Sequence, residues 1–199
     1  MNDPDLVPDG DPWELFERWF AEAQASEIND ANAMALATAD ARGAPSVRMV
    51  LLKGHDRQGI VFYTNSLSRK GREIAENPQA AVLFHWKSLR RQVRFAGELS
   101  TVTPAEADAY FASRARDSQV GAHASIQSAS LDDRETFVAR LREVEEKFAG
   151  QEVPRPGHWT GYRLDPERIE FWHDVPNRLH QRREFTRAGE GWASTLLYP

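Results

Sequence analysis

The chain has 199 residues, 25 of them basic and 30 acidic, which gives a formal net charge of −5. This length suits one buried core and is short for two, so we expect a single domain over residues 1–199. The negative charge disfavours nucleic acid as a partner, and the lack of cysteine excludes disulfides and thiolate metal sites and fits a cytoplasmic protein.

The N-terminal residues predict neither a secretory signal nor a membrane span. Residues 1–11 are acidic and contain proline, without the basic and apolar regions of a signal, and we expect them to be flexible. The longest purely apolar run, residues 80–84, is too short to cross a bilayer. We therefore expect no membrane partner.

An amphipathic helix is predicted over residues 12–25, because Asp11 and Pro12 suit a helix start and aromatic residues recur at helical spacing after them. A short helix is predicted from Ser68 to about residue 77, where a proline follows. Around it, β-rich runs separated by hairpin-type turns at residues 40–43 and 54–59 predict an antiparallel meander. These runs cover residues 34–38, 46–53, 60–64, 80–86 and 91–99.

The second half of the chain predicts two more helices and then a return to strands. Thr103 and Glu106 form a capping box, and Ser130 with Asp133 opens an amphipathic run that ends at residue 148. Strands are predicted over residues 161–164, 168–173, 178–187 and 192–197. Together the elements predict a mainly β chain with peripheral helices, an α+β fold built on a closed or nearly closed antiparallel barrel.

A candidate anion site lies at residues 63–70, where a strand ends and the short helix begins. The free N–H groups of a first helical turn favour a phosphate, and Arg69 and Lys70 add charge-assisted hydrogen bonds. Basic residues are otherwise unfavourable at a helix start. The alternative is a solvated basic pair after a loop.

Arg48 and Lys53 bracket the apolar segment 49–52, which we expect to be buried on both faces. Their charges indicate a ligand or the rim of a barrel. Five residues of separation place them on opposite faces of a regular strand, so one shared ligand requires a strong twist or a bulge. The alternative is that both side chains extend into water.

Two C-terminal segments alternate in a way that can form ligand-binding faces. In the first, Glu170 and Trp172 share a face that suits a flat aromatic ligand. In the second, strand alternation aligns Arg178, His180 and Arg182 on one side, which favours an anionic partner. The alternative is a set of surface ion pairs with nearby glutamates.

Residues 110–119, beyond the third helix, carry two arginines, a tyrosine and two serines, and form a second candidate phosphate clamp. Two anion sites with many aromatic residues favour a phosphorylated cofactor and a phosphorylated substrate. Six tryptophans exceed what packing of such a domain needs, so we expect some of them at a ligand site. No zinc-binding, Rossmann, P-loop or nucleophile-elbow motif occurs, and we expect no metal.

Eight motifs then occur in order along the chain. They are R-M-V-L-L-K at 48–53, F-Y-T-N at 62–65, S-R-K at 68–70, R-Q-V at 91–93, S-R-A-R-D-S-Q-V-G at 113–121, Q-S at 127–128, I-E-F-W at 169–172 and R-L-H-Q-R at 178–182. With these motifs the chain resembles the pyridoxamine 5′-phosphate oxidase family over nearly its whole length.

The resemblance implies an FMN-binding split barrel that works as a homodimer, with FMN held in clefts where the subunits meet. It implies that FMN contacts Arg48, Met49, Val50, Leu51, Leu52, Lys53, Tyr63, Thr64, Arg69, Lys70, Gln92, Gln127, Ser128, Trp172 and Arg182. It implies that the substrate is bound by Lys53, Tyr110, Arg114 and Ser118, with Arg178 and His180 as catalytic residues facing the pyridine ring.

The reaction implied by the resemblance is the oxidation of pyridoxamine or pyridoxine 5′-phosphate to pyridoxal 5′-phosphate, a step of vitamin B6 metabolism. Hydride leaves the C4′ carbon for flavin N5, and O₂ then reoxidises the flavin and becomes H₂O₂. In this reaction Arg178 presses on and polarises the substrate ring, while His180 hydrogen-bonds near the reacting amine or alcohol.

The chain departs from the family pattern in three places. Residues 1–11 contain neither the arginine nor the tyrosine that close over the substrate in many members. Ala115 stands where a proline is common, and residues 173–177 replace a glycine-containing loop. These departures bear on lid closure and on the choice of substrate.

Three other functions stay open from the sequence. A phenazine-type flavin oxidase would keep the FMN residues and change the substrate clamp. A non-catalytic protein that binds FMN or pyridoxal phosphate would use the same contacts without turnover. A helical interaction protein would need an exposed apolar seam on the helix that ends at residue 148, whose apolar positions we expect in the core.

Overall fold

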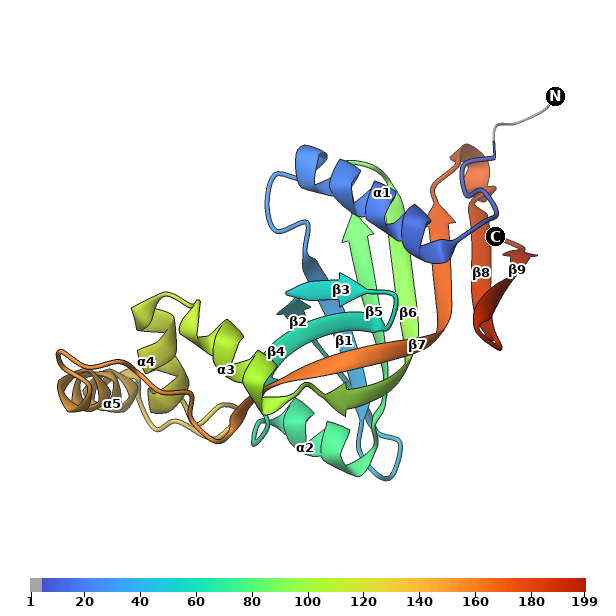
Figure 1. The fold of residues 1–199 in the computed structure, drawn as a ribbon. Coiled ribbons are helices and arrows are strands. Elements are labelled where there is room, and N and C mark those ends of the chain that lie inside the picture. The colour runs from blue at the N-terminus through green and yellow to red at the C-terminus, as the bar shows by residue number, and fades with distance from the viewer. Residues whose placement is uncertain (1–4) are drawn as a thin grey trace.

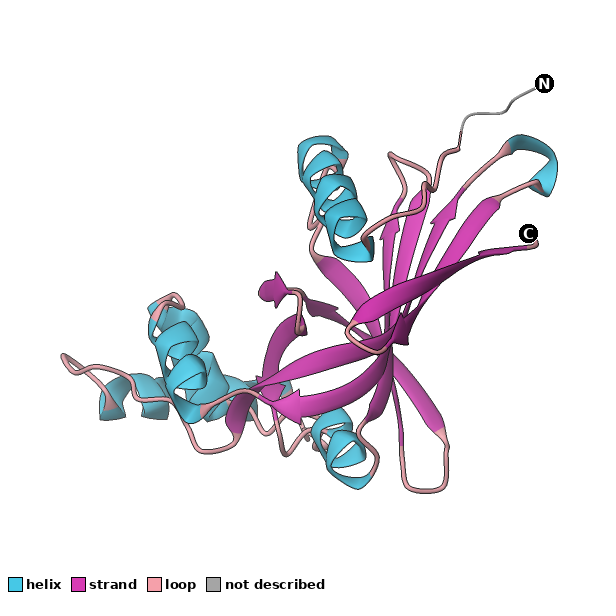
Figure 2. Cartoon of the chain, turned by 45° about the vertical axis from the view of Figure 1, so that its right-hand side comes forward, coloured by secondary structure: helices cyan, strands magenta, loops and turns pink. Residues whose placement is uncertain are grey.

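The computed structural model describes residues 5–199, which form a nine-stranded antiparallel sheet that curls on itself, with helices around it (Figures 1 and 2). The α-helices are α1 (Pro12–Ser26), α2 (Arg69–Glu76), α3 (Pro104–Ala112), α4 (Arg116–Ala124) and α5 (Arg134–Lys147), with a 3₁₀ turn η1 (Pro176–Arg178). The strands are β1 (Ala33–Ala39), β2 (Pro45–Leu51), β3 (Gly54–Asp56), β4 (Gly59–Asn65), β5 (Gln79–Trp86), β6 (Arg91–Thr101), β7 (Trp159–His173), β8 (Gln181–Ala188) and β9 (Gly191–Leu197). The predicted fold class, mainly β with peripheral helices, is confirmed.

Strand β7 holds the sheet together because it changes partner along its length. The sheet order is β2-β1-β5-β6-β7-β4-β3, while β8 pairs with the second half of β7 and β9 with β8. A register shift between Ala96 and Gly97, opposite Pro166, bends the β6–β7 ladder. Gly97 is required there, because a Cβ at this position would lie 2.0 Å from the carbonyl oxygen of Asp165. The two strands predicted over 161–164 and 168–173 are therefore one bent strand.

The main core lies between α1 and the concave side of the sheet. Trp13, Phe16 and Trp19 are almost fully buried on the apolar face of α1, as the helical spacing predicts. Phe16 packs against Phe84 and Phe95 with ring centroids 5.5 Å and 5.0 Å apart. Asp11 caps the helix by accepting a hydrogen bond from the backbone N–H of Trp13 at 2.8 Å.

A second, smaller core joins α3, α4 and α5 to the start of β7, at one end of the sheet (Figure 1). It contains the buried side chains of Phe111, Val120, Phe148 and Trp159. Leu141 and Val144 of α5 are half-buried and pack against this cluster, but no residue of α5 is fully buried, so the expected core face of this helix is only partly formed. Asp133 caps the start of α5 by accepting a hydrogen bond from the backbone N–H of Thr136 at 2.6 Å.

The structure corrects three element predictions. Helix α4 was not predicted, because its N-cap position, Ala115, makes no side-chain hydrogen bond and so leaves no sequence signal. The predicted turn 54–59 contains the short strand β3. Strand β8 begins at Gln181 and not at residue 178, since Asn177 and Arg178 have positive φ angles of 61° and 64° that end extended backbone.

Residues 5–9 contact the C-terminal strands. The backbone N–H of Leu6 donates to the side chain of Gln181 at 2.8 Å, and Val7 is fully buried. Arg183 donates to the carbonyl oxygen of Val7 at 2.8 Å and pairs with Asp5 at 3.4 Å. The expected flexibility of residues 1–11 stays a prediction, and residues 1–4 lie outside the described residues. Every helix among residues 5–199 is too short or too polar to span a membrane.

Candidate functional site

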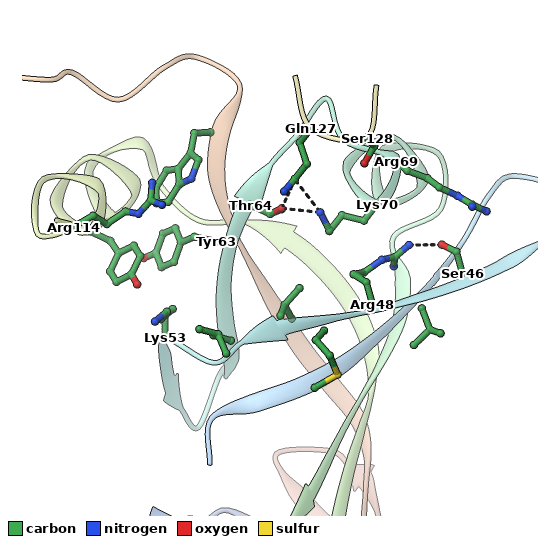
Figure 3. Close-up of a pocket in the computed structure, with 16 residues that line it drawn as sticks. Ser46, Arg48, Lys53, Tyr63, Thr64, Arg69, Lys70, Arg114, Gln127 and Ser128 are labelled. Carbon is green, nitrogen blue, oxygen red and sulfur yellow. Dashed lines mark hydrogen bonds between the residues drawn. The ribbon is translucent and has the colours of Figure 1, made fainter. Parts of the chain in front are cut away.

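A cavity of about 570 Å³ opens beside strand β2, the end of β4 and the start of α2 (Figure 3). Its volume lies in the range of small-molecule sites. It is lined by Ser46, Val47, Arg48, Met49, Val50, Leu51, Lys53, Tyr63, Thr64, Arg69, Lys70, Tyr110, Arg114, Gln127, Ser128 and Trp159. Five of these side chains are basic and none is acidic, although the whole chain carries a net charge of −5. The cavity therefore attracts anions.

The start of α2 forms one corner of this cavity and confirms the predicted helix boundary. Ser68 caps the helix by accepting a hydrogen bond from the backbone N–H of Gly71 at 3.3 Å. Lys70 is 8 % exposed, and its Nζ donates to Thr64 Oγ1 at 3.1 Å and to Gln127 Oε1 at 3.0 Å. Burial and the charge of Arg48, against the opposing effect of Glu73, lower the pKa of Lys70 to about 8.

A buried carboxylate, Glu73, fixes the two arginines of this corner. Its Oε2 lies 3.1 Å from Arg48 Nη2, and its Oε1 accepts from Arg69 Nε at 2.8 Å. Thr38 and Ser46 each donate to Oε2 at 2.5 Å. Burial alone would raise the pKa of Glu73, but these four hydrogen bonds lower it to about 2. The carboxylate is thus ionised at neutral pH and holds both guanidinium groups at the cavity.

Stacked aromatic rings form the opposite wall. The rings of Tyr63 and Tyr110 lie 4.1 Å apart at 15°, and Trp159 stacks on Tyr63 at 5.2 Å. Gly161 makes room for this stack, because a Cβ at that position would lie 2.6 Å from the ring of Tyr63. Trp159 lines the cavity, while the expectation that some tryptophans lie at a ligand site stays a prediction.

Arg114 reaches the cavity over this aromatic wall. Its guanidinium carbon lies 5.0 Å from the ring centroid of Trp159, and its Nη1 is buried without a hydrogen-bond partner among the described residues. Burial lowers the pKa of Arg114 below its ordinary value, opposed by Tyr110. Ser118 lies in an adjoining cavity of about 350 Å³, which shares Arg114 and four other lining residues with the first.

The cavity opens on a surface that we call the outer sheet face, formed by the convex-side residues of β2, β1 and β5. On β2 it exposes 68 % of Val47, 62 % of Met49 and 37 % of Leu51. Met49 lies directly across from Ala35 in the β1–β2 ladder, and Ala35 lies across from Leu83. The exposed face is therefore apolar, and its three β2 residues also line the cavity.

A second group of residues predicted for the site lies along one row of the same sheet. Gln92 pairs with Trp172, and Trp172 with Arg182, so their side chains share one face. The ring of His180 packs on Trp172 at 4.7 Å. Arg182 donates to Glu170 at 2.8 Å, so the ion pair with a glutamate that was weighed as the alternative does form, but Glu170 is buried and the pair is not a surface one.

This second group and Arg178 do not line the cavity of the same chain. Arg178 and His180 precede β8, and Arg178 sits in a left-handed conformation, so the prediction that strand alternation aligns them with Arg182 is wrong. Leu52 is also absent from the lining, because it is 4 % exposed within the main core.

Two expectations about β2 are also corrected. The segment 49–52 is not buried on both faces, because β2 is an edge strand whose residues alternate between the two sides. Arg48 and Lys53 nevertheless line the same cavity. Strand β2 ends at Leu51, and Lys53 lies in the connection to β3, where the alternation rule no longer applies.

Sequence reasoning missed Glu73 and Ser46. Glu73 lies four residues after Arg69, a spacing that signals a helical ion pair and was available in the sequence. Ser46 carries no such signal, because only the fold places its hydroxyl against Glu73. Within residues 5–199, no three His, Asp or Glu side chains gather in a way that can hold a metal ion.

The geometry described so far agrees with comparisons to known proteins. A protein-family model described as pyridoxamine 5′-phosphate oxidase matches residues 20–148. The chain belongs to this family. A second model, described as the pyridoxine 5′-phosphate oxidase C-terminal dimerisation region, matches residues 159–199, which include Trp172, Arg178 and His180. The protein is accordingly an oxidoreductase.

Its relatives cover nearly the whole chain. A protein of Sphingopyxis alaskensis named pyridoxine/pyridoxamine 5′-phosphate oxidase is 62 % identical, over 95 % of this chain and 88 % of its own length. One of Gluconobacter oxydans with the same name is 58 % identical over the full length of both chains. Among solved structures, PhzG from Burkholderia lata, in complex with tetrahydrophenazine-1-carboxylic acid, has a TM-score of 0.91 and 34 % identity, covering 100 % of this chain and 98 % of its own.

The fold also matches a pyridoxamine 5′-phosphate oxidase-related, FMN-binding protein from Nostoc punctiforme. Its TM-score is 0.76 over 96 % of this chain and all of that chain, at 17 % identity. At this identity the match supports the fold alone. Together with the PhzG match it confirms the predicted split barrel.

Proposed function

We propose that this protein catalyses the FMN-dependent oxidation of pyridoxamine and pyridoxine 5′-phosphates to pyridoxal 5′-phosphate, with O₂ as acceptor and H₂O₂ as product, in cytoplasmic vitamin B6 metabolism. One observation carries the proposal: a cavity in an acidic protein has five basic lining residues, no acidic one, and a buried Arg114 nitrogen without a hydrogen-bond partner in residues 5–199. Such a site suits two phosphate groups. The names of the closely related proteins support the substrate.

The FMN phosphate would bind at the start of α2. Arg48, Arg69 and Lys70 converge there, and the N–H groups of the first helical turn add favourable dipoles. Thr64 and Ser128 line the same corner and supply hydroxyl groups. The proposed FMN contacts of Met49, Val50, Leu51, Tyr63 and Gln127 fit the same cavity, while a role for Leu52 would have to act through its backbone.

The substrate phosphate would bind on the aromatic side of the cavity. Lys53, Tyr110 and Arg114 line it, and Ser118 lines the adjoining cavity that shares Arg114. A phosphate there would give Arg114 Nη1 the acceptor that it lacks. The basic residues at the start of α2 and those beside the stacked rings therefore lie on opposite sides of the cavity, which leaves room for a flat cofactor and a flat substrate between them.

We further propose that a second copy of this chain covers the outer sheet face and completes the site. Exposed apolar side chains of β2 both form this face and line the cavity, so a subunit that covers them also walls the cavity. The dimerisation region matched at residues 159–199 contains Trp172 and Arg182. In a two-fold dimer, the row Gln92–Trp172–Arg182 of one subunit would then face the cavity of the other.

FMN, when bound, supplies the acceptor for the hydride that leaves the C4′ carbon of the substrate. The protein contributes orientation and charge. Lys53 and Arg114 anchor the phosphate end of the substrate, while Arg178 and His180, from the partner subunit, would contact its pyridine ring and its reacting amine or alcohol. Closure of the site by two subunits would exclude water during the transfer.

Anaerobic reduction of the bound flavin tests this proposal. The protein is loaded with FMN, oxygen is removed, and pyridoxamine 5′-phosphate is added while the visible flavin absorbance is recorded. We expect rapid bleaching that reverses when air is admitted. If neither this substrate nor pyridoxine 5′-phosphate bleaches the bound FMN, the proposed reaction is wrong. Bleaching by a reduced phenazine precursor would then assign the PhzG-like activity, and no bleaching at all a binding role.

A further inference from the structure

Asp174 follows strand β7 and links two groups near the predicted catalytic histidine. Its Oδ2 accepts a hydrogen bond from Arg90 Nε at 2.6 Å, and its Oδ1 lies 2.9 Å from Nδ1 of His180. The backbone N–H of Asp174 also donates to the carbonyl oxygen of Arg90 at 3.0 Å. The carboxylate is therefore held on one side by Arg90 and presented to His180 on the other.

Two groups compete for the same nitrogen of His180. The backbone N–H of Val175 lies 3.2 Å from Nδ1, which as an acceptor would bond it. An accepting Nδ1 would, however, place its lone pair 2.9 Å from the Asp174 carboxylate, which is repulsive. A protonated Nδ1 instead faces the Asp174 carboxylate at the shorter of the two distances, 2.9 Å, where the partial positive charge of the N–H group and the negative carboxylate attract each other.

We propose that Asp174 is a positioning residue that keeps a proton on Nδ1 of His180, so that the neutral ring presents Nε2 as a hydrogen-bond acceptor to the ligand. This inference rests on the proposed function for its role in catalysis. Among the described residues, none forms a hydrogen bond with Nε2, and the ring packs on Trp172 at 4.7 Å. Nε2 is thus the nitrogen left for a ligand.

The surrounding charges keep Asp174 ionised. Hydrogen bonds from Arg90 lower the pKa of Asp174 below its ordinary value, against burial, and the charges of Arg90, His180 and Arg178 lower it further. His173 bonds to the backbone carbonyl oxygen of Asp174, at 3.0 Å, and not to its carboxylate. Burial lowers the pKa of His173. No other carboxylate forms an ion pair with His180 in the described part of the chain.

The position of this proton decides what His180 can do in the proposed reaction. When the C4′ carbon gives up a hydride, the attached ammonium or hydroxyl group also gives up one proton; the alcohol then becomes the aldehyde, while the amine becomes an iminium ion that water hydrolyses to the aldehyde and ammonia. An Nε2 lone pair can accept a hydrogen bond from that N–H or O–H and then take its proton. A neutral ring that carries its proton on Nε2 cannot. Asp174 therefore selects the tautomer that fits the reaction.

The ¹⁵N NMR chemical shifts of the two ring nitrogens of His180 show which of them carries the proton, and the measurement needs no substrate. The FMN-loaded protein is labelled with ¹⁵N-histidine, His180→Gln identifies the signals, and spectra are recorded where the ring is neutral. We expect the proton on Nδ1 in the wild type and on Nε2 in Asp174→Ala, where Val175 N–H becomes the partner. Asp165→Ala is the control, because Asp165 of β7 also pairs with an arginine, Arg187 of β8, and makes no ion pair with His180 among the described residues. A wild-type proton on Nε2, or an unchanged tautomer in Asp174→Ala, overturns the inference.

Flavin reduction tests the role in catalysis. We expect Asp174→Ala to slow anaerobic reduction by pyridoxamine 5′-phosphate by about tenfold or more, with FMN affinity unchanged, and Asp174→Asn, which keeps an oxygen acceptor, to slow it less. Wild-type rates in Asp174→Ala, despite a moved proton, would refute the positioning role. If the wild type itself is not reduced, the proposed function fails, and the nitrogen shifts alone then decide where Asp174 holds the proton.

Discussion

The imidazole of His180 packs on the indole of Trp172 with ring centroids 4.7 Å apart and 44° between their planes. Gln92 and Arg182 flank the same indole in the β6–β7–β8 ladders. These residues share the sheet with the five-cation cavity yet do not line it. If both groups serve one ligand, as we propose, the two halves of each site come from different subunits.

Mixed dimers test this arrangement. We expect Arg69→Ala with Lys70→Ala to weaken FMN binding, and Arg178→Ala to retain FMN but slow flavin reduction strongly, since the two changes affect different halves of the site. When the two inactive variants are unfolded together and refolded, random pairing should restore roughly a quarter of the wild-type sites. Reduction rates and subunit mass are measured on the mixture. No recovery, in a mixture shown to contain heterodimers, would mean that each site lies within one chain.

FMN affinity should fall at alkaline pH because Lys70 loses its proton there. Its pKa is about 8 in the free protein, where burial and then Arg48 disfavour the ammonium form, and a bound phosphate dianion would raise it. We therefore expect the Kd of FMN to rise by up to about tenfold per pH unit above pH 8. Fluorescence titration between pH 7 and about 9.5 measures it. Lys70→Arg, whose guanidinium stays charged, should give a flat profile; an equal slope in both proteins would exclude Lys70 as the cause.

The free energy of unfolding of the free protein should rise with pH as Lys70 loses its proton, whereas the FMN affinity falls. The pKa of Lys70 in the folded protein, about 8, lies below its ordinary value of 10.5, so the unfolded chain binds more protons between these two pH values. Stability should accordingly rise between pH 8 and 10.5 relative to Lys70→Met. Denaturant unfolding of both proteins at several pH values measures the difference.

Glu73 should stabilise the fold at neutral pH and lose this effect in acid. Its pKa falls from 4.5 to about 2, although burial opposes the shift, because Ser46, Thr38, Arg69 and Arg48 hydrogen-bond the carboxylate. The shift corresponds to about 3 kcal/mol, present above pH 4.5 and lost as the pH falls toward 2. We expect Glu73→Gln to lower the free energy of unfolding by about this amount at pH 7 and by much less near pH 3.

A matched control for Glu73 lies on the same helix. Glu76 is exposed, and its side chain accepts only one backbone hydrogen bond, from Ala41 at 3.3 Å. Glu76→Gln should therefore change stability by less than about 0.5 kcal/mol at either pH. Urea unfolding across this range compares the two variants. A pH-independent loss in Glu73→Gln would show that the hydrogen bonds, and not the charge, stabilise the fold.

Arg114 should contribute to substrate binding at a cost in stability. Its Nη1 is buried and has no hydrogen-bond partner in the described part of the chain, so Arg114→Met removes an unsatisfied cation while keeping most of the packing on Trp159. We expect the melting temperature to stay the same or rise, and the KM for pyridoxamine 5′-phosphate to increase by about tenfold or more. Differential scanning fluorimetry and steady-state kinetics measure the two effects.

Arg116 provides the contrasting substitution. It donates to the carbonyl oxygens of Gln151 and Phe148 at 2.8 Å and 2.6 Å and does not line the cavity. Arg116→Met should lower the melting temperature and leave KM unchanged. If Arg114→Met destabilised the protein as much as Arg116→Met does, Arg114 would be a structural residue.

The elements that the sequence predicted are those that depend on local chemistry. Helix α1 follows from Asp11, Pro12 and the periodic aromatic residues, and α2 starts after Ser68 as its capping hydroxyl indicates. The anion site at Arg69 and Lys70 was found for the same reason, because a strand end, a cap and two cations are adjacent in the chain. Helix α4, without a side-chain cap, gave no such signal.

The features that only the tertiary structure decided are contacts between residues far apart in the sequence. The sequence by itself determined the mainly β class, the starts of the helices that have a capping side chain and the family motifs, because each depends on residues close together in the chain. The fold decided that Arg48 and Lys53 share a cavity, that Glu73 binds two arginines, and that Asp174 meets His180. It also exposed the apolar side chains of β2, since burial depends on which strand occupies the sheet edge and not on the composition of the strand.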